Sequence, residues 1–252
     1  MNGENAVAEK VVVVGAGVMG AGIAQVMALA GCEVAACDID VEVLDKSQAD
    51  VEHGRFGIRG AVERGKVTAE EADAALARLS FSQDRAEAAA TADVVIEAVP
   101  ERLDLKVRIF RELDQECPPH TILASNSSGY PVQALAAATD RPDKVVGWHW
   151  ASPAPVMKLA EIVRCDATTD ETVETVTRLA QQAGKNPVVI KDVANAWGYV
   201  SNRVYFAMIQ EAQRVISEGV ATHEQVDQIM TDCFRWPSGP FGMVAGAGSG
   251  WS

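Results

Sequence analysis

The sequence predicts an α/β protein with a doubly wound sheet, followed by a small all-α C-terminal domain. Apolar, strand-like runs alternate with helix-like stretches through about residue 190, which is typical of parallel strands joined by crossover helices. Beyond that point the strand signals stop and only helical patterns remain. We therefore expect a first domain over residues 1–190 and a helical second domain over residues 191–252.

Seven apolar runs are the expected strands of the first domain. They cover residues 10–14, 33–37, 93–99, 121–125, 144–150, 158–164 and 186–190. Continuous apolar stretches such as Val11–Val14 indicate strands that are covered on both faces. Residues 41–79, between the second and third of these strands, are expected to form two helices that project from the sheet as a hairpin. The second of these helices begins at a capping box, Thr68–Glu71.

The second domain is expected to contain two helices, over about residues 197–218 and 223–233. The later helix begins at another capping box, Thr222–Gln225. The stretch that starts with WPSGPF and runs to the end is rich in glycine and proline. Because both residues interrupt regular structure, we expect no helix or strand there.

Composition and charge narrow the class of protein. A chain of 252 residues with 48% hydrophobic content can bury one or two cores. The formal net charge of −13 and the absence of dense Lys/Arg runs argue against a nucleic-acid partner. No apolar run reaches the roughly 18 residues of a membrane span, and no signal-peptide pattern begins the chain. We expect a cytoplasmic protein. Its five cysteines form no CxxC pair, which favours reduced structural thiols and no metal site.

A glycine-rich turn follows the first expected strand and begins the first helix. In Gly15–Gly20, GAGVMG, the first glycine permits a tight turn, the second lets the backbone approach a pyrophosphate, and the third allows close helix–strand packing. The next strand leads into Asp38, whose carboxylate would accept ribose hydroxyls and repel a 2′-phosphate. The pattern predicts a Rossmann-type site for NAD rather than NADP. Glycines that serve packing alone are the alternative.

One histidine has the position expected of a catalytic base. Transfer of hydride from a hydroxyl substrate needs a group that takes the hydroxyl proton, and histidine is suited to this near neutral pH. Of the four histidines, only His149 ends an expected strand on the carboxyl side of the sheet, where such sheets bind ligands. Antiparallel pairing with the next strand would bring Glu161 beside His149 and orient its imidazole. A hydrogen-bonded structural histidine is the alternative.

Several longer stretches follow one another in a specific order. They are VVGAGVMGAGIAQV, VIEAVPERLDLK, LASNSS, GWHWASPAPVMKLAEIV, a lysine-aspartate at 191–192, SNRV, and EGVAT followed by WPSGPF. With these stretches the chain resembles the short-chain 3-hydroxyacyl-CoA dehydrogenase family, including bacterial 3-hydroxybutyryl-CoA dehydrogenases, over residues 10 to about 242. The resemblance implies reversible oxidation of an (S)-3-hydroxyacyl-CoA to the 3-ketoacyl-CoA with NAD, in a homodimer formed through the C-terminal helices.

The resemblance also implies roles for individual residues. The catalytic pair falls on His149 and Glu161, while Ser128 and Asn202 would hold the reacting oxygen or the thioester carbonyl. The cofactor contacts fall on Gly15, Gly17, Val18, Met19, Gly20, Asp38, Glu101, Lys106, Asn126 and Ser152. Structural interpretations remain for some of them: Ser128 could cap a turn, Asn202 could be a polar helix residue, and Glu101 and Lys106 could be a solvated pair.

The chain departs from the family pattern at several places. Ser152 replaces an asparagine that contacts the cofactor, and the segment DVANAWGY, residues 192–199, is longer than its counterpart. The helical domain is expected to be shortened. The predicted hairpin lacks the usual lysine and serine arrangement; its basic residues are Arg55, Arg59, Arg64 and Lys66. Two alternatives therefore stay open: the same chemistry on a substrate bound to an acyl carrier protein, and a non-catalytic NAD-binding protein.

Overall fold

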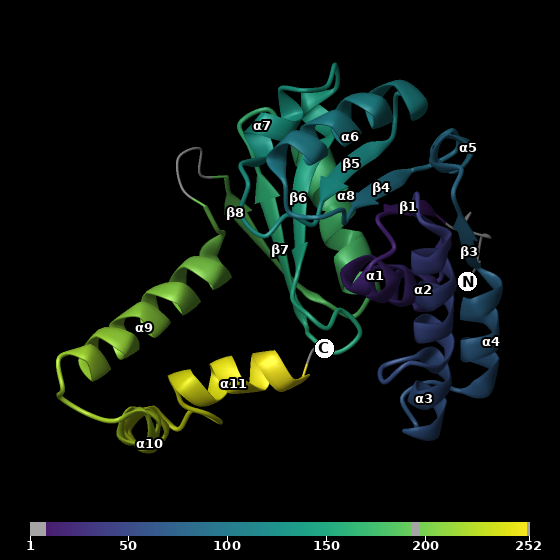
Figure 1. The fold of residues 1–252 in the computed structure, drawn as a ribbon. Coiled ribbons are helices and arrows are strands. Elements are labelled where there is room, and N and C mark those ends of the chain that lie inside the picture. Colours follow the sequence, from purple (N-terminus) through teal and green to yellow (C-terminus); the bar gives the residue numbers. More distant parts are fainter. Residues whose placement is uncertain (1–8, 193–196, 251–252) are drawn as a thin grey trace, which may run out of the picture. The chain divides into compact units, whose positions relative to one another are not determined.

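The computed structural model describes residues 9–192 and 197–250 (Figure 1). Two compact units make up the chain, residues 1–196 and 197–252. The described part of the first unit contains an eight-stranded sheet with helices on its faces, and that of the second unit contains three helices. The prediction of a doubly wound sheet followed by a helical region is therefore confirmed.

The sheet places its strands in the order β3-β2-β1-β4-β5-β6-β7-β8. Their bounds are β1 Lys10–Val14, β2 Glu33–Cys37, β3 Leu79–Ser82, β4 Val94–Glu97, β5 Ile122–Ser125, β6 Val145–Trp150, β7 Leu159–Arg164 and β8 Asn186–Lys191. Strands β3 to β6 run parallel along this order, and β7 runs antiparallel to β6. The strand order changes direction between β1 and β4, which is the position where doubly wound sheets bind ligands.

Helix α1 is the most enclosed helix of the first unit. Every residue from Gly20 to Ala28 is buried, because α1 packs on the sheet and also contacts α2 and α4. The helices of this unit are α1 Val18–Leu29, α2 Val41–His53, α3 Ile58–Glu63, α4 Ala69–Ala77, α5 Arg85–Ala89, α6 Leu103–Glu116, α7 Val132–Ala136 and α8 Asp170–Gln182, with a short 3₁₀ helix at Pro142–Lys144. The buried α1 fixes the direction in which the glycine-rich turn leaves β1.

The prediction of a two-helix hairpin over residues 41–79 was incomplete. This stretch contains α2, α3 and α4, and its last residue begins β3. Strand β3 was not predicted, because it has only four residues, LSFS, lies at the edge of the sheet and is at most half-buried. The predicted capping box did form: the Thr68 hydroxyl accepts from the Glu71 amide at 3.1 Å, and the Glu71 carboxylate accepts from the Thr68 amide at 2.8 Å.

The second unit contains α9 Val200–Ser217, α10 His223–Phe234 and α11 Pro240–Gly250. Helix α11 corrects the expectation of an irregular end. Pro240 stands at the first helical position, where a missing N–H costs little. The Asp227 carboxylate of α10 then accepts from the amides of Phe241 at 2.8 Å and Gly242 at 2.7 Å. This cap comes from another helix, so local composition could not indicate it.

Part of the sequence analysis falls outside the described residues. The longer segment, DVANAWGY, includes residues 193–196, and the end of the chain includes residues 251–252. Among the described helices, none combines the length and the apolarity that crossing a membrane would require.

Candidate active site

Five neighbouring strands bring most of the predicted site residues to one edge of the sheet. Strands β2, β1, β4, β5 and β6 are adjacent and parallel, so their carboxyl ends meet at the same edge. Asp38 follows β2, the glycine turn follows β1, Glu101 follows β4, and Asn126 follows β5. His149 lies at the end of β6. Ser128 shares the loop after β5, whereas Asn202 lies in α9 of the second unit.

The three glycines of the turn differ in whether the fold leaves room for a side chain at their position. Gly15 has a φ of +94°, and a Cβ there would lie 2.7 Å from the carbonyl oxygen of Ala98. A Cβ on Gly20 would lie 1.7 Å from the carbonyl oxygen of Gly15. A Cβ on Gly17 would meet no heavy atom of the protein within 4 Å. The chain itself therefore does not need glycine at position 17, and the bare backbone there fits the close approach of a dinucleotide pyrophosphate.

The carboxylate of Asp38 stabilises the same turn. Its Oδ2 accepts from the amide of Ala16 at 2.9 Å, and its Oδ1 accepts from the amide of Asp40 at 3.1 Å. Each carboxylate oxygen can accept a further hydrogen bond, so the group remains suitable for ribose hydroxyls. Val18, at the start of α1, is 69% exposed, and Met19 packs against the core. Ser152, in the loop after β6, is exposed.

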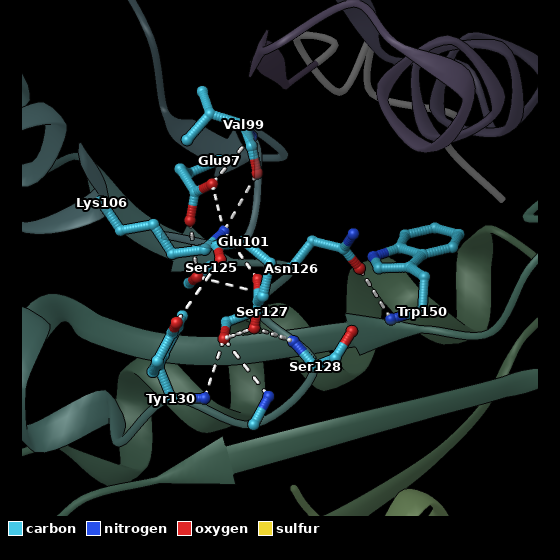
Figure 2. Close-up of polar contacts among 11 residues, drawn as sticks. Glu97, Val99, Glu101, Lys106, Ser125, Asn126, Ser127, Ser128, Tyr130 and Trp150 are labelled. Carbon is cyan, nitrogen blue, oxygen red and sulfur yellow. Dashed lines mark hydrogen bonds and ion pairs between the residues drawn. The ribbon is translucent and has the colours of Figure 1, made fainter. Parts of the chain in front are cut away.

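Glu101 connects the loop after β4 with the loop after β5 (Figure 2). Its Oε1 accepts from the Ser127 hydroxyl at 2.7 Å and from the Ser128 amide at 3.0 Å. Ser127 Oγ in turn accepts from the amides of Gly129 at 3.3 Å and Tyr130 at 3.0 Å. These contacts shape the turn that presents Ser128, one of the predicted substrate-binding residues.

Lys106, predicted to contact the cofactor, is buried beneath this loop. It is 1% exposed, and its Nζ lies 2.7 Å from Glu97 Oε1, 3.2 Å from the Val99 carbonyl oxygen and 3.2 Å from Glu101 Oε2. The interpretation of Glu101 and Lys106 as a solvated pair is therefore wrong for Lys106. Burial raises the pKa of Glu97, and the Lys106 ammonium opposes that rise.

Sequence reasoning missed Glu97. The residue is fully buried at the end of β4, whose sequence is VVIE. The signal in the sequence was a carboxylate at the last position of an otherwise apolar strand. A buried charge needs a partner, so this position indicates an ion pair or a hydrogen-bond network.

The predicted antiparallel pairing of β6 with β7 is confirmed, and its register sets His149 directly opposite Glu161. The two residues therefore share one face of the sheet. His149 Nδ1 lies 2.7 Å from Glu161 Oε2, with side chains 9% and 4% exposed. Two other histidines, His53 and His120, have largely exposed side chains, as expected from their polar segments.

Lys185 secures the loop between β6 and β7, and sequence reasoning missed this residue as well. Its Nζ donates to the carbonyl oxygens of Ala154 at 2.6 Å and Met157 at 2.8 Å, and lies 5.4 Å from the centre of the Trp150 ring. Burial lowers the pKa of Lys185 to about 8. The loop it holds directly follows β6, the strand that carries His149, and includes Ser152.

The combination of these features defines a class of protein. A glycine turn open to a ligand, a carboxylate at the end of β2 and a buried histidine–glutamate pair share one edge of a doubly wound sheet. This is the arrangement of an oxidoreductase that uses a nicotinamide dinucleotide.

Comparison with known proteins gives the family. Residues 10–193 match the 3-hydroxyacyl-CoA dehydrogenase NAD binding domain, and residues 198–252 match the C-terminal domain of the same family. The chain therefore belongs to the 3-hydroxyacyl-CoA dehydrogenase family. It is an NAD-dependent oxidoreductase.

Individual relatives agree with that assignment. The chain is 42% identical to a probable 3-hydroxybutyryl-CoA dehydrogenase of Bacillus subtilis, covering 94% of this chain and 80% of the relative. It is 36% identical to the mitochondrial hydroxyacyl-coenzyme A dehydrogenase of Sus scrofa, covering 93% and 74%. The crystal structure of (S)-3-hydroxybutyryl-CoA dehydrogenase from Ralstonia eutropha superposes with a TM-score of 0.85 at 38% identity, covering 91% and 79%.

Proposed function

We propose that this protein reversibly oxidises an (S)-3-hydroxyacyl-CoA to the 3-ketoacyl-CoA, with His149 as the general base. The observation that carries the proposal is the buried contact of 2.7 Å between His149 and Glu161 at the carboxyl edge of the sheet. The names of the relatives, which act on hydroxyacyl and hydroxybutyryl CoA esters, support a CoA thioester as substrate.

In the proposed mechanism, Nε2 of His149 removes the proton of the C3 hydroxyl during oxidation and returns it during reduction. Glu161, at Nδ1, keeps the imidazole in the required tautomer and stabilises its protonated form. NAD, when bound, supplies the hydride acceptor. Ser128 would hold the reacting oxygen or the thioester carbonyl, and so stabilise the negative charge that develops there. By the family resemblance, Asn202 of the second unit is a candidate for the same role.

The cofactor would be held mainly by backbone. The first amides of α1, exposed by the glycine turn, would face the pyrophosphate, and Asp38 would accept from the ribose hydroxyls. The proposed contacts further along the sheet edge are Glu101, Asn126 and Ser152.

The carrier-protein alternative would need a basic docking surface on the α2–α4 region. Arg59, the central candidate, already pairs with Glu52 at 3.3 Å and with Asp73 at 2.5 Å. These ion pairs reduce the positive charge available to an acidic partner, so we favour the free CoA ester.

One assay separates the three possibilities. NADH oxidation is followed with acetoacetyl-CoA, and separately with an acetoacetyl group on an acyl carrier protein. Turnover of the CoA ester supports the proposal, selectivity for the carrier-bound group supports the alternative, and NADH binding without turnover supports a non-catalytic protein. His149→Gln should remove most turnover with little change in NADH affinity, while the exposed His120→Gln serves as the matched control. A rate for His149→Gln equal to that of the wild type would contradict the mechanism.

We also propose that two copies associate through the helices of the second unit, residues 197–252. Large apolar side chains on these helices and their connections stay more than half exposed, at Val204, Val220, Ile229 and Phe234. Association of two copies would remove these apolar side chains from water, which is the driving force of the proposed contact. Sedimentation velocity should give a dimer, and a monomer at every protein concentration would contradict the proposal.

A further inference from the structure

Two buried, oppositely charged side chains lie beside the loop that carries Asn126 and Ser128 (Figure 2). Glu97 is 0% exposed and Lys106 is 1% exposed, and their charged atoms lie 2.7 Å apart. A buried pair of this kind is weak evidence for stability, because removing two charges from water offsets much of their attraction. Stability alone therefore does not explain why Glu97 and Lys106 are buried as a pair.

Two contacts of Glu97 reach the end of β5 and the start of the loop that follows it. Its Oε2 accepts from the Ser125 hydroxyl at 2.7 Å, and the same hydroxyl accepts from the Ser127 amide at 3.1 Å. The backbone carbonyl of Glu97 accepts from the Asn126 amide at 2.8 Å. Glu97 thus holds the first residues of the loop through both its side chain and its backbone.

The contacts of Lys106 lead to the same loop by a second route. Its three N–H groups match three acceptors, on Glu97, Val99 and Glu101, at 2.7, 3.2 and 3.2 Å. Glu101 then binds Ser127 and the amide of Ser128 through its other oxygen. With its donors used in this way, Lys106 acts on Glu101 rather than on a bound molecule.

We propose that Glu97 is a positioning residue for the dehydrogenase reaction: it fixes Lys106, which fixes Glu101, and the two carboxylates together hold the loop of residues 126–130. This inference rests on the proposed function, because the loop carries Asn126 for the cofactor and Ser128 for the substrate. Two carboxylates share one ammonium in this cluster. When the Glu97 charge is lost, Lys106 is expected to shift toward Glu101. The hydrogen bonds that Glu101 accepts from Ser127 and Ser128 are then disturbed.

Glu97→Gln is the direct test, because glutamine has the same shape. Its carbonyl oxygen can accept from Lys106 and the Val99 amide, and its NH₂ group can donate to Ser125. We expect a folded protein whose kcat falls by about tenfold and whose Kd for NADH rises by about threefold, since the ion pair between Lys106 and Glu97 becomes a weaker hydrogen bond from the ammonium to a neutral amide oxygen. NADH fluorescence and the acetoacetyl-CoA assay measure the two quantities.

Two further variants separate positioning from stability. Lys106→Met leaves the buried carboxylate of Glu97 without its cation, so the variant should be destabilised. The double variant Glu97→Gln/Lys106→Met removes both charges. We expect it to regain melting temperature without regaining kcat, because the ammonium that pairs with Glu101 Oε2 is then missing. A pair that serves stability alone predicts that activity returns together with melting temperature. The matched control is Arg108→Met, which removes an exposed cation from the same helix and should leave kcat unchanged.

The outcomes are distinct. The inference is overturned if folded Glu97→Gln keeps kcat and the Kd for NADH within about twofold of the wild type. If Glu97→Gln does not fold, the double variant decides, and full recovery of its kcat overturns the inference. Wild-type protein that never turns over acetoacetyl-CoA would refute the proposed function instead. The NADH affinities of the variants would then still test the effect of Glu97 on the loop.

Discussion

Gly17→Ala separates the demands of a bound cofactor from the demands of the fold. A Cβ at this position meets no protein atom within 4 Å, and the backbone has a φ of −64° and a ψ of −170°, which alanine adopts freely. We expect the free energy of unfolding to change by less than about 1 kcal/mol, since the lost N-cap preference and the gained chain stiffness oppose each other. The added methyl group should nevertheless occupy the space of the pyrophosphate.

The expected loss of binding is large by comparison. If the methyl group keeps the pyrophosphate from the amides of α1, the Kd for NADH should rise by at least about tenfold, which is about 1.4 kcal/mol. Thermal melting and NADH fluorescence titration measure the two effects on the same sample. Gly20→Ala is the contrasting variant: its Cβ would lie 1.7 Å from the Gly15 carbonyl oxygen, so it should lose stability as well as binding. Wild-type NADH affinity in Gly17→Ala would refute the placement of the pyrophosphate at this turn.

Three other predictions concern the carboxylates and the lysine near the site. Glu161→Gln should lower kcat by about a hundredfold with little change in NADH affinity, because the imidazolium loses its counter-charge; steady-state kinetics would check this. Asp38→Asn should reduce the preference for NADH over NADPH by about tenfold, because the carboxylate no longer repels the 2′-phosphate; the ratio of the two kcat/KM values measures it. Folded Lys185 has a pKa of about 8, below the ordinary 10.5, so the unfolded chain binds the extra proton between these values and stability should rise with pH there, by at most about 3 kcal/mol. Lys185→Met should abolish this rise in denaturant titrations at about pH 7.5 and about pH 9.5, and an identical rise in the variant would exclude Lys185 as its source.

The parts of the site that depend on local sequence could be predicted. The strand, the glycine turn and the start of α1 are contiguous, so their spacing carried the information. The facing of His149 and Glu161 was also predictable, because two short strands close in the chain have few ways to pair. In both cases groups close in the chain carried the information, so no distant contact was needed to place them.

Other parts could not be predicted, because their partners lie far apart in the chain. Ser125 is 28 residues from Glu97, and Lys185 is 31 residues from Ala154, whose carbonyl it holds. Each of these side chains has several polar neighbours that only the assembled sheet brings near. Helix α11 was missed for the same reason, since its start depends on Asp227 of α10. The sequence shows which residues carry charge. It does not show which distant group forms the hydrogen bond or ion pair with each of them.

Helix α1 links the proposed cofactor part of the site to the proposed catalytic part. The glycine turn lies at its beginning, and Gly22, further along, faces the loop that follows His149: a Cβ there would lie 3.1 Å from Cδ of Pro155 and 3.2 Å from Cβ of Ala154. Lys185 holds the same loop through the Ala154 carbonyl. The loop is therefore fixed against the helix whose N-terminus would bind the pyrophosphate. Hydride and proton transfer need the reacting atoms aligned within a fraction of an ångström, and one rigid helix shared by both parts provides that alignment more reliably than two separate supports would.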